Sequence, residues 1–473
     1  MGPRSAWSIR PARLLLVLAM GALALTSCIE GPIAGTPSLA GIIPLASVGY
    51  QQQEFFLSAE DATAYQATAP LTADGRWSAA PAPGTGGTTF VTRIVVHRPV
   101  DPARFDGTVV VEWMNVTAGL DLGNDWIYAH NEIVRSGAAW VGVSAQVVGV
   151  NAVKAADATR YAKLVHPGDS YSYDIFTRAG RAVRDNPTVL GGLVPERLIA
   201  TGESQSASRL VTYIDAVHPL VHVYDGFLVH SRGSSGALLS QSPLPSVSTP
   251  SPSLIRDDLD EPVFVVQAEG DVISSNLAVG QPDTARFREW ELAGTAHADT
   301  YMAGVGFTDV GDGAGAVQMF SLMRNPNPPP SDCASSPNAG GHHWTFQAAL
   351  HGLDEWIRTG TPPASGPPLL VASTSPVVLQ RDAVGNALGG VRSPHVDAPV
   401  ATLTGINSGS GFCRLFGSTV PLTAQQLAER YPTHEAFVDA WRTATEAAVA
   451  GGFLLQPDAD ELLAAAQAST VPS

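Results

Sequence analysis

The chain is 473 residues long, which is enough for a large hydrophobic core with insertions. Its 43 acidic residues outnumber the 27 Lys and Arg residues, and the formal net charge is −16. The sequence contains no basic patch, so the composition argues against nucleic acid and other polyanions as partners. It also lacks internal repeats and a phosphate-binding glycine loop, and we expect neither a cofactor nor a metal ion.

The amino-terminal segment has the features of an export signal. Arginines at positions 4, 10 and 13 precede an apolar run that is too short to span a membrane and ends in Leu25-Thr26-Ser27-Cys28. This ending resembles a bacterial lipobox. We therefore predict a signal peptide over residues 1–27, lipidation of Cys28, and a polar tether over residues 28–44 that links a cell-envelope lipoprotein to a membrane. The alternative is an ordinary cleavable signal and a simply secreted protein.

Strand and helix patterns alternate after the tether. The expected elements are edge strands near Glu54–Leu57 and Phe90–His97, buried strands over Thr108–Trp113 and 138–144, and a crossover helix over Tyr173–Arg184. Strands that alternate with helices predict an α/β fold with a mostly parallel central sheet and helices on both faces.

A strand, a sharp turn and a helix meet around Ser204. The apolar run Leu198-Ile199-Ala200 stops at Gly202, and an amphipathic helix begins with small residues directly after the serine. This arrangement lifts a serine hydroxyl clear of a parallel sheet. Ser206 stands where a second glycine is usual, and a serine that merely caps the helix is the alternative interpretation.

The strand that begins at Pro262 presents two candidate acids. A run of β-favouring residues leads into Ala268-Glu269-Gly270-Asp271. A carboxylate at this place can hold a catalytic imidazole in the useful tautomer and stabilise its cation. We favour Asp271, which lies a few residues past the strand, and keep Glu269 as the alternative acid.

A histidine follows the next strand. The segment Phe287–Leu292 alternates as a strand does, and Gly294 opens the loop that presents His297. This imidazole could take the proton of Ser204 as the hydroxyl attacks a carbonyl carbon. The rival is the pair His342-His343, which follows a loop rather than a strand and is therefore less favoured.

Acyl transfer also needs donors for the negatively charged oxygen of its tetrahedral intermediate. One donor is expected to be the backbone N–H of Gln205, directly after the candidate nucleophile. The second is expected in the loop that follows the strand Thr108–Trp113. Asn115 or Val116 would supply it.

Two insertions and a carboxyl-terminal elaboration enlarge the chain. The segment 233–258 follows an expected strand over Gly226–His230, is rich in Ser and Pro, and is a candidate lid or pocket wall. The segment 300–341 is expected to be a long Gly- and Pro-rich loop. The segment 366–473 adds strand-like pieces and helices over Ala424–Ala450, interrupted at Pro432, and Asp458–Ala468. We interpret residues 45–473 as one domain that includes these additions.

The cysteines predict one disulfide. If Cys28 is lipidated, Cys333 and Cys413 remain as an even pair in an oxidising compartment. Each lies in a loop that is rich in small residues. Two free thiols are the alternative.

The chain resembles an α/β-hydrolase, and more narrowly a family of secreted bacterial "alpha/beta hydrolase domain" proteins. The resemblance covers most of the chain from about Ser47 to the last helix, and it rests on Gly202-Glu203-Ser204-Gln205-Ser206-Ala207, Glu291-Leu292-Ala293-Gly294-Thr295-Ala296-His297-Ala298-Asp299 and Gly389-Gly390-Val391-Arg392-Ser393-Pro394. It implies the α/β-hydrolase fold and serine-dependent ester hydrolysis by Ser204, His297 and either Asp271 or Glu269. It implies no substrate.

Together these features predict a serine hydrolase that cleaves a small-molecule or polymer-borne carboxylic ester through an acyl-enzyme. An acyltransferase or an amidase would use the same residues. A different class of protein, a surface-anchored binding lipoprotein that kept the fold without activity, is the other alternative. The intact set of serine, acid and histidine favours the enzyme.

Overall fold

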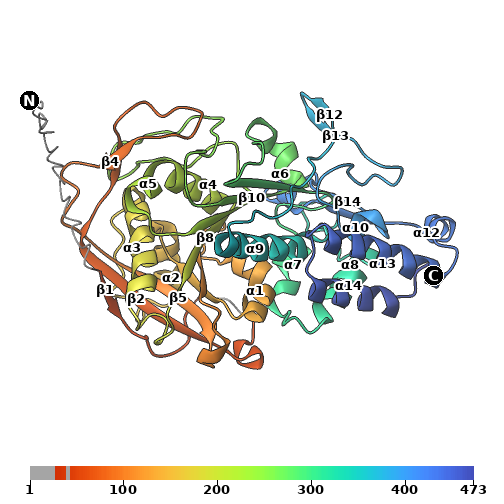
Figure 1. The fold of residues 1–473 in the computed structure, drawn as a ribbon, viewed down its shortest axis with the longest axis horizontal. Coiled ribbons are helices and arrows are strands. Elements are labelled where there is room, and N and C mark those ends of the chain that lie inside the picture. The colour runs from red at the N-terminus through yellow and green to blue at the C-terminus, as the bar shows by residue number, and fades with distance from the viewer. Residues whose placement is uncertain (1–26, 39–42, 473) are drawn as a thin grey trace, which may run out of the picture.

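The computed structural model describes residues 27–38 and 43–472. Within these residues a nine-stranded sheet in the order β1-β2-β5-β7-β6-β8-β9-β10-β11 forms the centre of the molecule (Figure 1). Its strands are β1 (Cys28–Glu30), β2 (Tyr50–Ala62), β5 (Thr88–Pro99), β6 (Thr108–Trp113), β7 (Ala139–Val143), β8 (Arg197–Glu203), β9 (Gly226–His230), β10 (Val263–Ala268) and β11 (Phe287–Leu292). The strands from β7 to β11 are mutually parallel, whereas β1, β2 and β5 pair in antiparallel fashion. The predicted α/β fold with a mostly parallel sheet is confirmed.

Helices cover both faces of this sheet, as the sequence predicted (Figure 1). They are α1 (Asn124–Ser136), α2 (Val147–Ala156), α3 (Ser172–Asp185), α4 (Gln205–Thr212), α5 (His218–Val221), α6 (Glu269–Ser274), α7 (Thr300–Ala303), α8 (Ala314–Arg324), α9 (His342–Thr359), α10 (Pro394–Asp397), α11 (Cys413–Phe416), α12 (Ala424–Arg430), α13 (His434–Ala450) and α14 (Gln456–Ala468). Short two-stranded sheets are formed by β3 (Tyr65–Ala67) with β4 (Ala79–Pro81), β12 (Val371–Thr374) with β13 (Val377–Leu379), and β14 (Ala401–Thr404) with β15 (Ser418–Pro421).

The central strands are buried on both faces, which is why they read as continuous apolar runs. In β6, Val110 points into the core that contains residues of α1 and α9. Its neighbours Val109 and Val111 point into the core that contains residues of α3 and α4. The alternation of a strand therefore places two hydrophobic cores on opposite sides of one sheet.

The segment expected to be a tether is part of the sheet. Cys28 to Glu30 form the edge strand β1, and they pair with Ser58 to Phe56 of β2. Further along, the N–H of Ile33 donates to the carbonyl oxygen of Glu54 at 2.8 Å, and Arg160 donates to the carbonyl oxygen of Ala34 at 2.5 Å. The expectation of a polar spacer over residues 28–44 is therefore wrong for the described part of it. The backbone N–H and C=O groups of this segment pair with those of β2, which would otherwise be the open edge of the sheet.

The segment 300–341, expected to be a loop, contains the helix α8. Its residues Met319, Phe320 and Met323 are buried in the same core as α13 and α14, and the rings of Phe320 and Trp441 lie 5.4 Å apart. Figure 1 shows α8 beside these two helices at one end of the molecule. The Gly- and Pro-rich flanks of α8 hid a short apolar helix face in the sequence.

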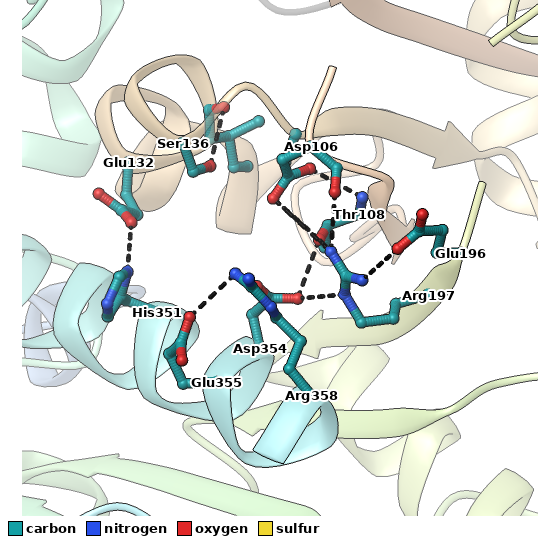
Figure 2. A network of polar contacts seen from close by, with 12 residues as sticks. Asp106, Thr108, Glu132, Ser136, Glu196, Arg197, His351, Asp354, Glu355 and Arg358 are labelled. Atoms are coloured by element: carbon teal, nitrogen blue, oxygen red, sulfur yellow. Dashed lines mark hydrogen bonds and ion pairs between the residues drawn. The ribbon is translucent and has the colours of Figure 1, made fainter. Parts of the chain in front are cut away.

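A polar network joins the amino ends of β6 and β8 to α9 (Figure 2). Arg197 at the start of β8 donates to Asp354 of α9 at 2.9 Å, and Thr108 at the start of β6 donates to the same oxygen at 2.9 Å. The half-buried carboxylate therefore bonds to both neighbouring strands. This end of the sheet is held by polar contacts, and the opposite, carboxyl end carries the candidate catalytic residues.

Candidate active site

Ser204 occupies the sharp turn between β8 and α4. Its φ of 59° and ψ of −115° lie outside the regions that L-residues ordinarily occupy. Gly202 lets the strand and the helix pass close together, because a Cβ there would make a tight contact of 3.1 Å with the backbone of Ser206. The Ser206 hydroxyl, which replaces the usual second glycine, accepts from the N–H of Glu203 at 3.1 Å and donates to its carbonyl oxygen at 2.8 Å. Ser206 therefore stabilises the turn through two hydrogen bonds to the backbone of Glu203.

His297 lies between Ser204 and Asp271. Its Nε2 is 2.8 Å from the Ser204 Oγ, and its Nδ1 is 2.6 Å from Oδ1 of Asp271. A carboxylate only accepts, so Nδ1 carries a hydrogen, and in the neutral imidazole Nε2 is left to accept from the serine hydroxyl. The other oxygen of Asp271 accepts from the N–H of Ala268 at 2.8 Å, which fixes the carboxylate at the end of β10.

Glu269, the alternative acid, lies elsewhere in the structure. One of its oxygens accepts from Arg381 at 2.7 Å and from the N–H of Gly405 at 3.1 Å. The other accepts from the N–H of Gly294 at 2.9 Å. Glu269 therefore anchors the loop that presents His297, and its contacts are with that loop and with Arg381 rather than with the imidazole.

The rival histidines also serve this loop. Nδ1 of His342, which is fully buried, donates to the carbonyl oxygen of Ala296 at 2.9 Å, directly before His297. The ring of His343 stacks on Tyr301 with centroids 3.5 Å apart. Neither imidazole contacts Ser204, so the structure places both as supporting residues.

A buried relay extends from His342 beneath the site. His342 and His230 face each other through their Nε2 atoms at 2.9 Å, and Nδ1 of His230 is 2.7 Å from Asp125. Since Ala296 can only accept, neutral His342 must accept from His230. One proton is then left between His230 and Asp125. Burial raises the pKa of Asp125 to about 7 and lowers the pKa of His230 to about 4, and both shifts favour the carboxyl group as the carrier of that proton.

A second carboxylate adjoins the imidazole of His297. Oε1 of the buried Glu203 lies 3.1 Å from Nε2 of His297, and its Oε2 accepts from Asn124 at 2.8 Å and from Asn115 at 3.1 Å. Burial alone would lower the pKa of His297, but the charges of Asp271 and Glu203 outweigh it and raise the pKa to about 9. The same imidazolium lowers the pKa of Asp271 against the effect of burial.

The candidate oxyanion donors fare differently. The N–H of Asn115 donates to the carbonyl oxygen of Leu122 at 2.7 Å, and the N–H of Leu122 donates to the carbonyl oxygen of Asn115 at 3.0 Å. Asn115 is therefore wrong as a backbone donor, because its N–H is already bonded within a small bridge. Its side chain instead donates to the carbonyl oxygen of Glu203 at 2.8 Å. The backbone N–H groups of Gln205, the first residue of α4, and of Val116 stay predicted oxyanion donors.

Two chambers meet at Ser204 and His297. One is a cavity of about 220 Å³ whose apolar wall includes Leu122, Met302, Phe412, Leu415 and Phe416. The other, which we call the polar chamber, is a cavity of about 470 Å³ whose wall includes the polar residues Ser208, Ser231, Arg232, Ser274 and Arg414 among apolar surface. A substrate that spans the serine would therefore meet an almost wholly apolar surface on one side and a surface with more polar groups on the other.

The short helix α11 forms part of the wall of both chambers. Cys413 at its start is joined to Cys333 by a disulfide, so the predicted bridge is present in the structure. Phe412 and Leu415 lie on the apolar side, and Arg414 lies on the polar side, where it donates to Ser274 at 3.4 Å. The bridge therefore holds a wall of the site to the segment 300–341.

Sequence reasoning missed Asn124, Asp125 and His230. They come from α1 and β9, and no motif marks them. The only available signal was position, because His230 ends a strand that was expected over Gly226–His230. Side chains just past parallel strands meet at one edge of a sheet.

The fold and the site define an α/β hydrolase. The chain belongs to the alpha/beta hydrolase domain family, whose profile matches residues 25–464. No curated protein matches the chain.

Several solved esterases share parts of the fold at low identity. A glucuronoyl esterase from Solibacter usitatus is 10% identical, with 60% of this chain and 82% of that chain covered and a TM-score of 0.30. A CE15 glucuronoyl esterase from Teredinibacter turnerae is 11% identical, with 56% and 74% covered and a TM-score of 0.28. An esterase from Pyrobaculum calidifontis is 16% identical, with 42% and 72% covered and a TM-score of 0.26.

Proposed function

We propose that the protein is a serine hydrolase that cleaves carboxylic esters through an acyl-enzyme on Ser204. The observation that carries the proposal is the continuous hydrogen-bonded path from Ser204 through His297 to Asp271, at 2.8 and 2.6 Å, on a strained turn between a strand and a helix. This geometry matches the requirements of a nucleophile, a general base and an orienting acid.

The reaction follows from these contacts. Nε2 of His297 takes the proton of Ser204 as the hydroxyl oxygen attacks the ester carbonyl, and the carboxylates on both sides stabilise the imidazolium. The imidazolium then gives this proton to the leaving alcohol, which leaves the acyl group on Ser204. In the second half a water molecule attacks the acyl carbon while its proton passes to His297. The imidazolium then gives this proton to the Ser204 oxygen as the bond between that oxygen and the acyl carbon breaks and the carboxylic acid leaves. The N–H groups of Gln205 and Val116 are the proposed donors to the oxyanion.

The two chambers support an ester whose acyl and alcohol parts differ in polarity. The apolar chamber of about 220 Å³ suits a small hydrocarbon group. The polar chamber, with its serines and Arg414, suits a part rich in hydroxyl or anionic groups. Such a part can belong to a small molecule or to a polymer.

Variant kinetics with short p-nitrophenyl esters test the proposal. Ser204→Ala should lower kcat by at least ~10³-fold, and Asp271→Asn by on the order of 10³–10⁴-fold, without loss of the fold. Glu269→Gln is the matched control, because it neutralises a nearby buried carboxylate that bonds the loop instead of the imidazole. It should lower the melting temperature more than it lowers kcat.

The outcomes separate the alternatives. Full activity in folded Ser204→Ala would overturn the proposal. A larger kcat loss in Glu269→Gln than in Asp271→Asn would reassign the acid. A wild-type protein that hydrolyses no ester and yet binds one would favour the binding lipoprotein.

A further inference from the structure

A second cluster of ligand-type side chains lies away from the serine. His218 is the first residue of the short helix α5, His222 directly follows this helix before β9, and Glu261 precedes β10. Since the catalytic residues follow the carboxyl ends of the parallel strands, this cluster lies at the opposite, amino end of the same sheet. One nitrogen from each histidine and one oxygen of Glu261 lie within 4.8 Å of one another.

His218 is a buried histidine whose only charged neighbour among the described residues is Glu261. Its side chain is fully buried, and neither ring nitrogen has a hydrogen-bond partner among the described residues. Nε2 lies 3.1 Å from Oε2 of Glu261, which is an ion-pair distance, but neither atom makes a hydrogen bond of ordinary geometry. Both atoms therefore remain available to a third partner in the space between the side chains.

The spacing fits a metal ion in that space. Nδ1 of His222 lies 3.5 Å from Oε1 of Glu261, and the His218 contact is 3.1 Å. Ligands at zinc distances on a tetrahedron are separated by about 3.3 Å, which lies between these two values. Two imidazoles and one carboxylate are also a donor set that zinc and its neighbours in the first transition row prefer.

The backbone at His222 supports the same conclusion. Its φ of 43° lies in the left-handed region, which is uncommon for residues other than glycine. A glycine would occupy this position at the end of α5 without strain. A strained histidine here directs an exposed imidazole toward Glu261.

We propose that His218, His222 and Glu261 form a binding site for one divalent transition-metal ion of the zinc type, with water in the fourth position. The ion would join the turn between α5 and β9 to the start of β10. Its role is to stabilise the fold at the amino end of the sheet, and it takes no part in ester cleavage. The proposal is therefore independent of the proposed function.

Zinc binding by the untagged full chain tests the site. After removal of metal with a chelator, the protein is titrated with Zn²⁺, and bound metal and melting temperature are measured. We expect one Zn²⁺ per chain and a melting temperature that rises by a few degrees at saturation. With Co²⁺ instead, the visible absorption should be that of a four-coordinate site with nitrogen and oxygen ligands.

His222→Gly is the decisive variant, because glycine accepts the left-handed backbone and the metal-free protein should be at least as stable as the wild type. It should lose both the bound Zn²⁺ and the rise in melting temperature. The matched control is His351→Ala, which removes another histidine that faces a glutamate, Glu132 at 2.9 Å, without a second imidazole (Figure 2). It should bind Zn²⁺ as the wild type does.

Glu261→Gln provides a second test that does not depend on the backbone at position 222. It should weaken Zn²⁺ binding at least tenfold. Wild-type protein that binds no Zn²⁺, or His222→Gly protein that binds it as tightly as the wild type, would overturn the proposal. Equal loss in His351→Ala would show that the zinc is held by scattered surface histidines, and this too would overturn it.

Discussion

The imidazole of His297 is held by two carboxylates rather than one. Asp271 lies at Nδ1, whereas Glu203 lies at the nitrogen that must accept the serine proton. A general base works only when it is neutral, so a pKa of about 9 places the free site largely in its protonated form at pH 7. The smaller fraction of neutral imidazole at pH 7 is offset once the imidazolium forms in the reaction, because both charges stabilise it.

Replacement of Glu203 by Gln should move the acidic limb of the kcat/KM profile to lower pH. Removal of one negative charge lowers the pKa of His297, so the neutral imidazole persists into more acidic solution. Conversely, wild-type activity should rise with pH until about 9. Activity against a neutral ester from pH 5 to 10 measures the limb. An unchanged limb would mean that Glu203 does not act on His297.

The raised pKa also fixes the sign of a stability effect. The folded pKa of His297 exceeds that of a free imidazole, so its contribution to stability is fully present below about pH 6.5. It is lost as the pH rises through about 9. The ion pair of His297 with Asp271 is thus expected to stabilise the fold most at the low pH at which the enzyme is least active.

Among the residues of the candidate active site, the sequence pointed clearly to three. Ser204, Asp271 and His297 each follow a strand, and their order along the chain is one that a sequence reveals. The relay of Asp125 and His230 joins distant segments through hydrogen-bond geometry, which no local pattern records. Likewise, Asp271 and Glu269 are only two residues apart, and the choice between them depended on which side chain is directed toward His297.

Among the elements, α11 has the largest expected effect on substrate binding. Leu415 and Phe416 of α11 and Phe412 directly before it line the apolar chamber, and the disulfide from Cys413 ties the helix to Cys333. A helix of four residues has little stability of its own, so its position depends on this bond and on packing.

Simultaneous Cys333→Ser and Cys413→Ser substitution should therefore change both stability and binding. A sequence separation of 80 residues corresponds to about 4 kcal/mol of unfolding free energy in the chain-entropy model. KM for esters with a bulky apolar part should rise more than kcat falls, because the wall moves while the serine turn stays. Thermal melts and kinetics measure these effects. A double variant with wild-type stability and KM would contradict this role.

The helices and strands were easier to predict than their partners in space. Apolar runs revealed β6, β8 and β10, and Pro432 correctly interrupted the pattern between α12 and α13. In contrast, the short apolar face of α8 was hidden by flanking glycines and prolines. The edge strand β1 was unexpected, because three residues give no periodic signal and are fixed only by pairing with β2.

At the scale of the whole molecule, we propose that the protein is exported and anchored by a lipid on Cys28. The predicted signal peptide lies outside the described residues except for Ser27. No helix in the described ranges has the length and apolar character needed to cross a bilayer. Cys28 is exposed and belongs to β1, so the attached lipid would lie at the edge of the central sheet.

Replacement of Cys28 by Ser tests this anchor. Two or three acyl chains give stable membrane residence, because each buried methylene contributes about 0.8 kcal/mol. Wild-type protein should partition into the detergent phase, whereas the variant should enter the aqueous phase or keep its signal peptide. Wild-type protein that stays in the aqueous phase and begins downstream of Cys28 would instead be simply secreted.

The most direct test of the central claim is covalent labelling with a fluorophosphonate, followed by peptide mapping. This reagent reacts with a serine that a neighbouring base has activated. We predict a single label on Ser204, loss of the label in Ser204→Ala, and retention in Ser208→Ala, which removes a serine from the wall of the polar chamber. A folded wild-type protein that is not labelled, or a label on another serine, would contradict the assignment of Ser204 as the nucleophile.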